Sequence, residues 1–177
     1  MSEKGLMHVY YGDGKGKTSA ALGLAVRAAG CGKKVVIIQF IKGWKCGEHE
    51  SLSKITNIKL IKSKPASSKF IHDMTEDEKS ETKIIQDESL RKALALVEEN
   101  RCDVLILDEA VDACNLGVLD VELIEDLITE KPEALELVIT GHKADDRFIK
   151  RADYVTEMKK HKHPYDEGIK ARRGIEF

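Results

Sequence analysis

The sequence predicts an α/β fold in which a mostly parallel sheet lies between two layers of helices. Apolar segments of strand length alternate with segments of helix length, which is the pattern of parallel strands joined by helical crossovers. The chain has 177 residues, of which 42% are hydrophobic, enough to build one ordinary core. We therefore expect a single three-layer domain that covers residues 1–177.

The first strand and the first helix enclose a glycine-rich turn. Leu6 to Tyr11 is the expected strand, Thr18 to Ala29 is the expected helix, and the turn is Gly12-Asp13-Gly14-Lys15-Gly16-Lys17-Thr18. Glycines bring backbone N–H groups close to an anion, and the helix adds its positive end. Lys17 would reach terminal phosphates, and the Thr18 hydroxyl would ligate Mg²⁺. A phosphate-binding loop usually has glycine where this chain has Tyr11, so we expect a shortened or reshaped variant.

A second motif supports the first. Val104 to Leu107 is an apolar run that ends in Asp108-Glu109. Such a run is typical of a buried parallel strand, and its carboxylates then emerge at the edge of the sheet where ligands of open α/β folds bind. A Gly-Lys-Thr string can also join a strand to a helix by chance, but both motifs in the expected order favour a P-loop nucleotide site.

The remaining elements complete the alternation. The other expected strands are 34–40, 58–61, 135–140 and 154–158, and the other expected helices are 75–100, 120–129 and 146–151. Thr75 and Glu78 form a capping box that opens the long helix 75–100. The sheet is therefore expected to have five or six strands.

Composition limits the classes of partner. Lysine plus arginine number 29 and aspartate plus glutamate number 31, a net charge of -2, so we expect no nucleic-acid partner. No apolar run approaches the roughly 18 residues that span a bilayer, and the N-terminus lacks a signal-peptide core, so we expect a cytoplasmic protein without a membrane partner.

The four cysteines are widely spaced, which favours free thiols over a metal cluster. We expect Cys102 and Cys114 in the core and Cys46 exposed in a loop.

Two loop residues are further site candidates. Trp44, the only tryptophan, follows the second strand; an exposed tryptophan more often packs locally, but it can also stack on a ring. His142 follows the strand 135–140 on the ligand side and could contact a phosphate, although a lone histidine there is more often an ordinary loop residue. Both alternatives stay open for each residue.

Taken together, these segments resemble the ATP:corrinoid adenosyltransferases of the cob(I)yrinic acid a,c-diamide type, a family of P-loop proteins. The resemblance runs nearly end to end. It rests on the loop 12–18, on 36–43 (Val-Ile-Ile-Gln-Phe-Ile-Lys-Gly), on 105–109 (Leu-Ile-Leu-Asp-Glu), on 139–141 (Ile-Thr-Gly) and on the tail from His163 to Phe177.

The resemblance implies a fold of the P-loop NTPase-like, RecA type and a distinct chemistry. In that family the cobalt(I) of a corrinoid attacks the 5′ carbon of ATP, and triphosphate leaves, in cobalamin biosynthesis or salvage. The resemblance further implies that the loop from Gly12 to Thr18 holds triphosphate, that Thr18, Asp108 and Glu109 hold Mg²⁺, and that the tail, about 159–177, packs near the active site. It also implies an electron-donating reductase as partner and a homodimer.

Two departures from the family pattern concern substrate contacts. Family members often have Phe-x-Trp over the corrin, and this chain has Phe70-Ile71-His72, so we expect Trp44, Phe70 and His72 to face the corrinoid with one aromatic fewer. The family commonly has arginine where this chain has His142, which loses the bidentate contact of arginine with phosphate. The alternatives are a P-loop small-molecule kinase or ATPase, and a non-catalytic nucleotide or corrinoid carrier.

Overall fold

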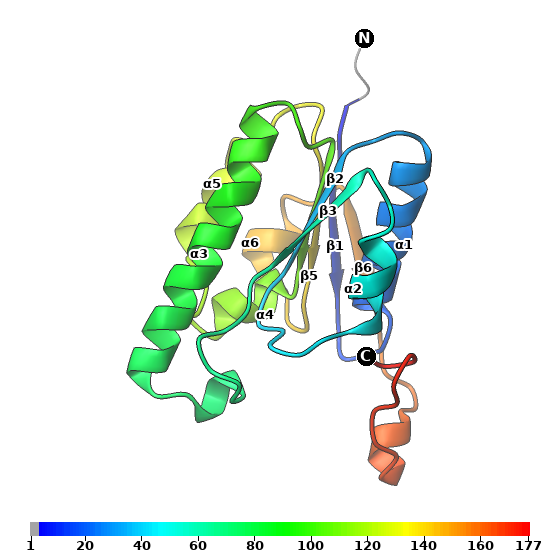
Figure 1. The fold of residues 1–177 in the computed structure, drawn as a ribbon, viewed down its shortest axis with the longest axis vertical. Coiled ribbons are helices and arrows are strands. Elements are labelled where there is room, and N and C mark those ends of the chain that lie inside the picture. Colours follow the sequence, from blue (N-terminus) through cyan, green and yellow to red (C-terminus); the bar gives the residue numbers. More distant parts are fainter. Residues whose placement is uncertain (1–3) are drawn as a thin grey trace.

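The computed structural model describes residues 4–177 and contains one six-stranded sheet in the order β3-β2-β4-β5-β1-β6 (Figure 1). The strands are β1 (Met7–Tyr11), β2 (Val35–Gln39), β3 (Ile58–Lys62), β4 (Val104–Asp108), β5 (Glu136–Thr140) and β6 (Tyr154–Glu157). Every strand pair is parallel. The predicted α/β fold class is therefore confirmed. The first three residues of the predicted domain lie outside the described part.

The helices form two layers around this sheet. They are α1 (Lys17–Gly30), α2 (Gly47–Leu52), α3 (Glu76–Glu98), α4 (Ala110–Asn115), α5 (Val121–Thr129) and α6 (Asp146–Ile149), with short 3₁₀ turns at Ile71–Asp73 and Pro164–Glu167. In Figure 1, α1 and α2 lie on one side of the sheet, and α3, α4, α5 and α6 lie on the other. Two apolar clusters of the core match these layers, the smaller one under α1 and the larger one under α3 to α6.

The central strands explain why the sheet is stable. All five residues of β2 and of β4 are buried, because helices cover both faces of these strands. Apolar side chains fill both faces, and the two buried polar residues, Gln39 and Asp108, stand at the carboxyl ends. The two central strands therefore place their buried polar groups at one edge of the sheet.

Three local expectations were incomplete or wrong. The short helices α2 and α4 were not predicted, because six residues carry too little periodicity to be recognised. Cys46 is buried rather than exposed, since it caps α2: its side chain accepts from the N–H of His49, and the His49 side chain accepts from the N–H of Cys46. Cys102 is buried as expected, and Cys114 is partly buried.

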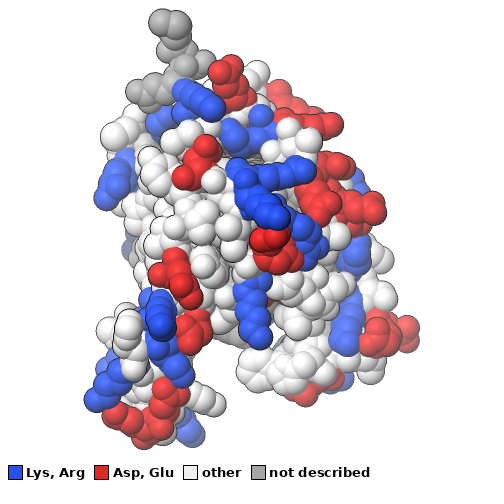
Figure 2. All heavy atoms as spheres, turned by 180° about the vertical axis from the view of Figure 1, so that it is seen from behind, with Lys and Arg blue, Asp and Glu red and all other residues white. Residues whose placement is uncertain are grey.

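Charges are mixed over the surface. Figure 2 shows acidic and basic side chains interspersed over one face, and the tail that projects at its lower left carries both signs. Among residues 4–177, no helix combines the length and the apolar character that a bilayer crossing requires.

Candidate active site

The glycine-rich turn forms a tight loop between β1 and α1. This loop packs against the C-terminal end of β6. Gly12 and Gly16 adopt φ values of 114° and 119°, which favour glycine. A Cβ on Gly14 would lie 2.5 Å from the carbonyl oxygen of Met158. The N–H of Gly12 donates to the His142 carbonyl at 3.0 Å, and that of Gly14 donates to the Met158 carbonyl at 2.6 Å. These two N–H groups are therefore engaged within the protein, and the loop keeps its shape without a ligand.

Lys17 and the start of α1 supply positive charge at this loop. The Lys17 ammonium donates to the carbonyls of Gly12 at 2.7 Å and Gly14 at 2.9 Å, so it is folded back over the loop. No side chain caps the N-terminus of the 14-residue helix α1. Its first N–H groups and its dipole therefore face the loop, which is the arrangement that binds phosphate.

Asp108 is the centre of a buried polar cluster at the end of β4. One carboxylate oxygen accepts hydrogen bonds from the hydroxyls of Thr18 at 2.9 Å and Thr140 at 2.8 Å. The other oxygen accepts from the amide of Gln39 at 3.2 Å and the ammonium of Lys42 at 2.8 Å. A fully buried carboxylate needs such partners to remain charged.

Lys42 joins this cluster from the loop after β2. Its ammonium lies 2.8 Å from Asp108, 3.4 Å from Glu109 and 3.5 Å from the Thr18 hydroxyl, and its side chain is only 9% exposed. Burial opposes the charge on Lys42, but the Asp108 and Glu109 carboxylates outweigh it and raise its pKa. Sequence reasoning did not list Lys42 as a site residue, although the string that carries the resemblance contains it.

Backbone strain flanks this cluster just after the ends of β2 and β4. Ile41 has a φ of 50° and Glu109 a φ of 61°, a left-handed region that non-glycine residues rarely adopt and that is least favourable for a β-branched side chain. Strain of this kind persists only where the surrounding structure enforces it, and it is concentrated at functional sites. The two residues redirect the chain so that Lys42 and the Glu109 side chain approach each other.

Glu109 titrates in an unusual range. Burial, opposed by Lys42 and reinforced by Asp108 and Asp112, raises the pKa of Glu109 to about 7. Near neutral pH its carboxyl group is therefore partly protonated, and a nearby cation would shift it to the charged form.

The cluster fits a hard divalent cation such as Mg²⁺. Thr18, Asp108 and Glu109 present a hydroxyl and two carboxylates, the oxygen donors that Mg²⁺ prefers. The same three groups already converge on the Lys42 ammonium, which shows that their geometry accommodates positive charge.

Three hollows surround the cluster. The loop hollow, about 270 Å³, is lined by residues 13–19, Glu109, His142, His163, Ile175 and Glu176. The central hollow, about 580 Å³, is lined by Thr18, Ser19, Leu22, Lys42, Trp44, Glu109, residues 46–48, Ser51 and residues 174–177. The apolar hollow, about 240 Å³, is lined by Ile41, Gly43, Trp44, Pro65, residues 67–72, Glu109 and Leu116. Glu109 lines all three, so the three hollows meet at this residue.

The predicted loop residues Asp13 and Lys15 contact the tail. An Asp13 carboxylate oxygen accepts from the Lys160 N–H at 2.9 Å, which together with weaker effects lowers the pKa of Asp13. The Lys15 ammonium binds Glu176 at 2.9 Å. These contacts bring residues 174–177 to the walls of the loop and central hollows, a placement that no local sequence signal could give.

His142 lines the loop hollow and is held by one acid. Its N–H donates to the Asp112 carboxylate at 3.0 Å, and its Nδ1 lies 3.0 Å from the same carboxylate. The hydrogen bond to Asp112 raises the pKa of His142. The imidazole is therefore cationic over a wider pH range than a free histidine, which restores part of the charge of an arginine.

The three predicted aromatic candidates lie together along the apolar hollow. Trp44 is 52% exposed and Phe70 is 64% exposed, both unusual for large apolar side chains. The rings of Phe70 and His72 are stacked at 5.6 Å with an interplanar angle of 11°. The hollow thus offers flat, exposed faces beside Glu109.

Comparison with known proteins identifies the same family as the sequence motifs. Residues 3–177 match the family model described as ATP:corrinoid adenosyltransferase BtuR/CobO/CobP. The chain is 34% identical over 176 residues to a corrinoid adenosyltransferase of Escherichia coli K12, covering 99% of this chain and 87% of the relative. It is 35% identical over 177 residues to one of a Sinorhizobium species (99% and 81%), and 30% identical over 176 residues to corrinoid adenosyltransferase CobA of Salmonella typhimurium (99% and 87%). The chain belongs to the ATP:corrinoid adenosyltransferase family and is a transferase that adenosylates corrinoids.

Proposed function

We propose that this enzyme transfers the 5′-deoxyadenosyl group of ATP to the cobalt(I) of a corrinoid and releases triphosphate. The observation that carries the proposal is the junction of the three hollows at Glu109. The loop hollow suits a triphosphate, the central hollow has room for a nucleoside, and the apolar hollow with its exposed rings suits a corrin face. A reaction between a nucleotide and a large flat ring needs such a junction.

In the proposed step the cobalt(I) lone pair forms the bond to the 5′ carbon as the bond from that carbon to oxygen breaks. The electron pair of the broken bond leaves with the triphosphate. The corrinoid is itself the nucleophile, so the protein need not supply a base, and catalysis consists of alignment and charge neutralisation.

The residues of the cluster divide this work. Lys17 exchanges its two loop carbonyls for phosphate oxygens, and His142, held by Asp112, adds a second positive group. Thr18, Asp108 and Glu109 would hold Mg²⁺, which would neutralise charge on the leaving triphosphate. Lys42 pairs with the Asp108 carboxylate at 2.8 Å and holds it in position for that role. Trp44, Phe70 and His72 would contact the corrinoid face.

The direct test is anaerobic incubation with ATP, Mg²⁺ and chemically reduced cobalamin, with the cobalt(I) absorbance followed and the phosphate product identified. Loss of the cobalt(I) band with triphosphate release is expected. Conversion of ATP to ADP with an unchanged band would instead support a kinase or ATPase, and no change in either would support a carrier. The Lys17→Ala variant is the matched control, since it should lose the reaction while the apolar hollow stays intact.

Three further points belong to the proposal and are supported by the family alone. The enzyme would act in the cytoplasm, would receive a corrinoid reduced by a separate reductase, and would form a homodimer. Sedimentation equilibrium tests the dimer, and omission of the chemical reductant in favour of a flavin-dependent reductase tests the electron supply.

A further inference from the structure

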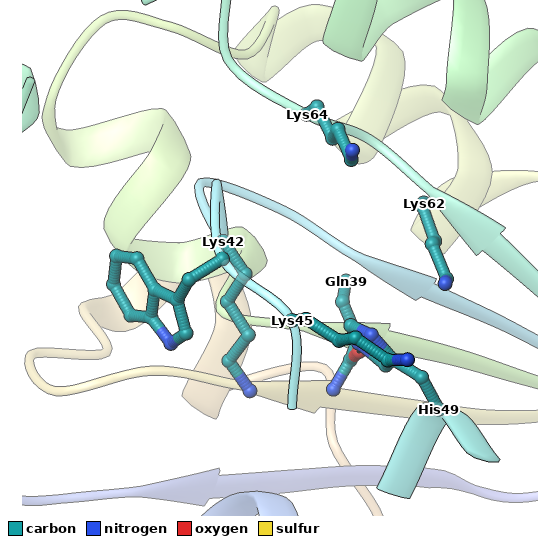
Figure 3. A pocket seen from close by; sticks show the side chains of 7 residues that line it. Gln39, Lys42, Lys45, His49, Lys62 and Lys64 are labelled. Carbon is teal, nitrogen blue, oxygen red and sulfur yellow. The ribbon is translucent and has the colours of Figure 1, made fainter. Parts of the chain in front are cut away.

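A fourth cavity lies beside the hollows and is lined by lysines. This lysine pocket has a volume of about 130 Å³, and its walls include Lys42, Lys45, Lys62 and Lys64 (Figure 3). Figure 3 shows the side chains of Lys62 and Lys64 pointing from β3 and the segment after it toward the space over Gln39. Four lysines in the wall of so small a volume make the pocket a positively charged site.

The floor of the lysine pocket is fixed and neutral. Gln39 and His49 are buried there, with exposed fractions of 2% and 7%. The His49 Nδ1 accepts from the Cys46 N–H, so its Nε2 carries the proton and donates to the Gln39 side-chain oxygen at 2.7 Å. Burial lowers the pKa of His49, and the charge of Lys62 lowers it further. Neither Gln39 nor His49 carries a negative charge, while the Glu48 carboxylate accepts from the Gln39 amide at 3.2 Å.

Two of the four lysines lack an acidic partner. Lys42 is paired with Asp108, and Lys45 is paired with Glu50 at 2.7 Å. Within residues 4–177, Lys62 and Lys64 form no salt bridge. Two unpaired ammonium groups that point into one cavity are the recognition chemistry of an anionic group, either a carboxylate or a phosphate.

The position of the pocket indicates which molecule carries that anion. Trp44 lines the lysine pocket, the central hollow and the apolar hollow, and Lys42 lines the first two. The loop hollow, where the triphosphate of ATP would bind, shares none of the residues that line the lysine pocket. A molecule seated in the apolar hollow can therefore extend a side group past Trp44 into the lysine pocket, while the phosphates of ATP lie elsewhere.

We infer that the lysine pocket binds an anionic group on the rim of the corrinoid substrate, with Lys62 and Lys64 as its specificity determinants. The inference rests on the proposed function. The pocket, about 130 Å³, is far too small for a corrin ring, but it accommodates a carboxylate or a phosphate. Corrinoids carry such groups in two places: free carboxylates on incompletely amidated rings, and the phosphodiester of a nucleotide loop.

Three corrinoids distinguish the free carboxylates from the phosphodiester as the group that the lysine pocket binds. Cobyrinic acid a,c-diamide has free carboxylates, cobalamin has a phosphodiester with amidated side chains, and cobinamide has neither. The Lys62→Met/Lys64→Met double variant removes both unpaired charges and keeps the apolar stems, and Lys59→Met, an exposed lysine on the same strand outside the pocket, is the matched control. We expect the ratio of the KM for the anionic corrinoid to the KM for cobinamide to rise about tenfold in the double variant. Lys59→Met should leave that ratio unchanged.

The outcomes identify the group or overturn the inference. A change only with cobyrinic acid a,c-diamide assigns a carboxylate, and a change only with cobalamin assigns the phosphodiester. Equal changes for all three corrinoids, no change for any, or a change in the KM for ATP alone overturns it. If the wild-type protein transfers no adenosyl group, the proposed function fails, but equilibrium dialysis of the same corrinoids still measures the binding ratio. The Lys64→Met single variant repeats the test should the double variant unfold.

Discussion

Removal of the Lys42 ammonium should destabilise the protein through the carboxylate that it leaves behind. The Lys42 and Asp108 side chains are 9% and 0% exposed, and the atoms of the pair are 2.8 Å apart. Loss of one partner from a buried pair costs about 3–5 kcal/mol, because the other charge stays buried. Asp108 keeps hydrogen bonds from Thr18, Thr140 and Gln39, so we expect the lower end, about 3 kcal/mol, for Lys42→Met.

The assay is urea unfolding at pH 7 without nucleotide, together with the thermal midpoint. For a chain of this size, about 3 kcal/mol lowers the midpoint by roughly 6–12 °C. The pKa of Lys42 is raised, so its stabilising contribution is complete at neutral pH and is lost only at strongly alkaline pH. Lys45→Met is the control, because its pair with Glu50 is 72% and 64% exposed and its removal should leave the midpoint unchanged.

A second substitution tests whether the unpaired Asp108 carboxylate causes the loss of stability. Asp108→Asn in the Lys42→Met background removes the unpaired charge and should recover part of the lost stability. The reasoning is refuted if Lys42→Met lies within about 1 kcal/mol of the wild type, or if the double variant is no more stable than Lys42→Met.

Four further predictions concern the loop, the hollows and pH. Lys17→Ala should weaken ATP binding by about ten- to 150-fold in calorimetry, since a charge-assisted contact with phosphate is worth about 1.5–3 kcal/mol; unchanged affinity would contradict its phosphate role. His72→Trp should lower the KM for cobalamin by about threefold to tenfold through added aromatic contact, and an equal effect on ATP binding would count against a corrinoid-facing position. The pKa of Glu109 is raised from 4.5 to about 7, so the folded state favours the protonated form and loses about 3 kcal/mol of stability as pH rises across that range. Glu109→Gln should therefore match the wild type near pH 4.5 and exceed it in urea unfolding at pH 8. Gly14→Ala should cost about 1–3 kcal/mol, because its Cβ would meet the Met158 carbonyl at 2.5 Å, whereas Gly23→Ala, with open space around it on α1, should gain about 1 kcal/mol; equal thermal midpoints would refute the contrast.

Local patterns were sufficient to predict the six strands and four of the six helices that residues 4–177 form, but not the short helices α2 and α4. The apolar run before Asp108 and the capping box at Thr75 are signals within a few residues, and the structure places β4 and the start of α3 at these positions. The two ligand motifs were also predicted to meet, because parallel strands end at the same edge. The hydrogen bond from Thr18 to Asp108, 90 positions apart, confirms that meeting.

Long-range electrostatic contacts could not be predicted in this way. Lys42 belongs to the site because Ile41 adopts a strained φ that redirects the chain, and nothing in the local sequence indicates that conformation. The burial of Cys46 depends on a cap shared with His49, an unusual pair of capping residues. The contact between Lys15 and Glu176 depends on where the whole tail folds. The residues were visible in the sequence, but their partners were not.

The position of Trp44 gives the enzyme a built-in optical reporter. It is the only tryptophan of the chain, it is about half exposed, and it borders three cavities in which different parts of the substrates would bind. Its fluorescence emission should therefore respond to each ligand without any label: stacking of an adenine or a corrin on the indole should quench the emission, and exclusion of water should shift it to shorter wavelength. Stopped-flow recording of this single signal would then give the order in which nucleotide and corrinoid enter.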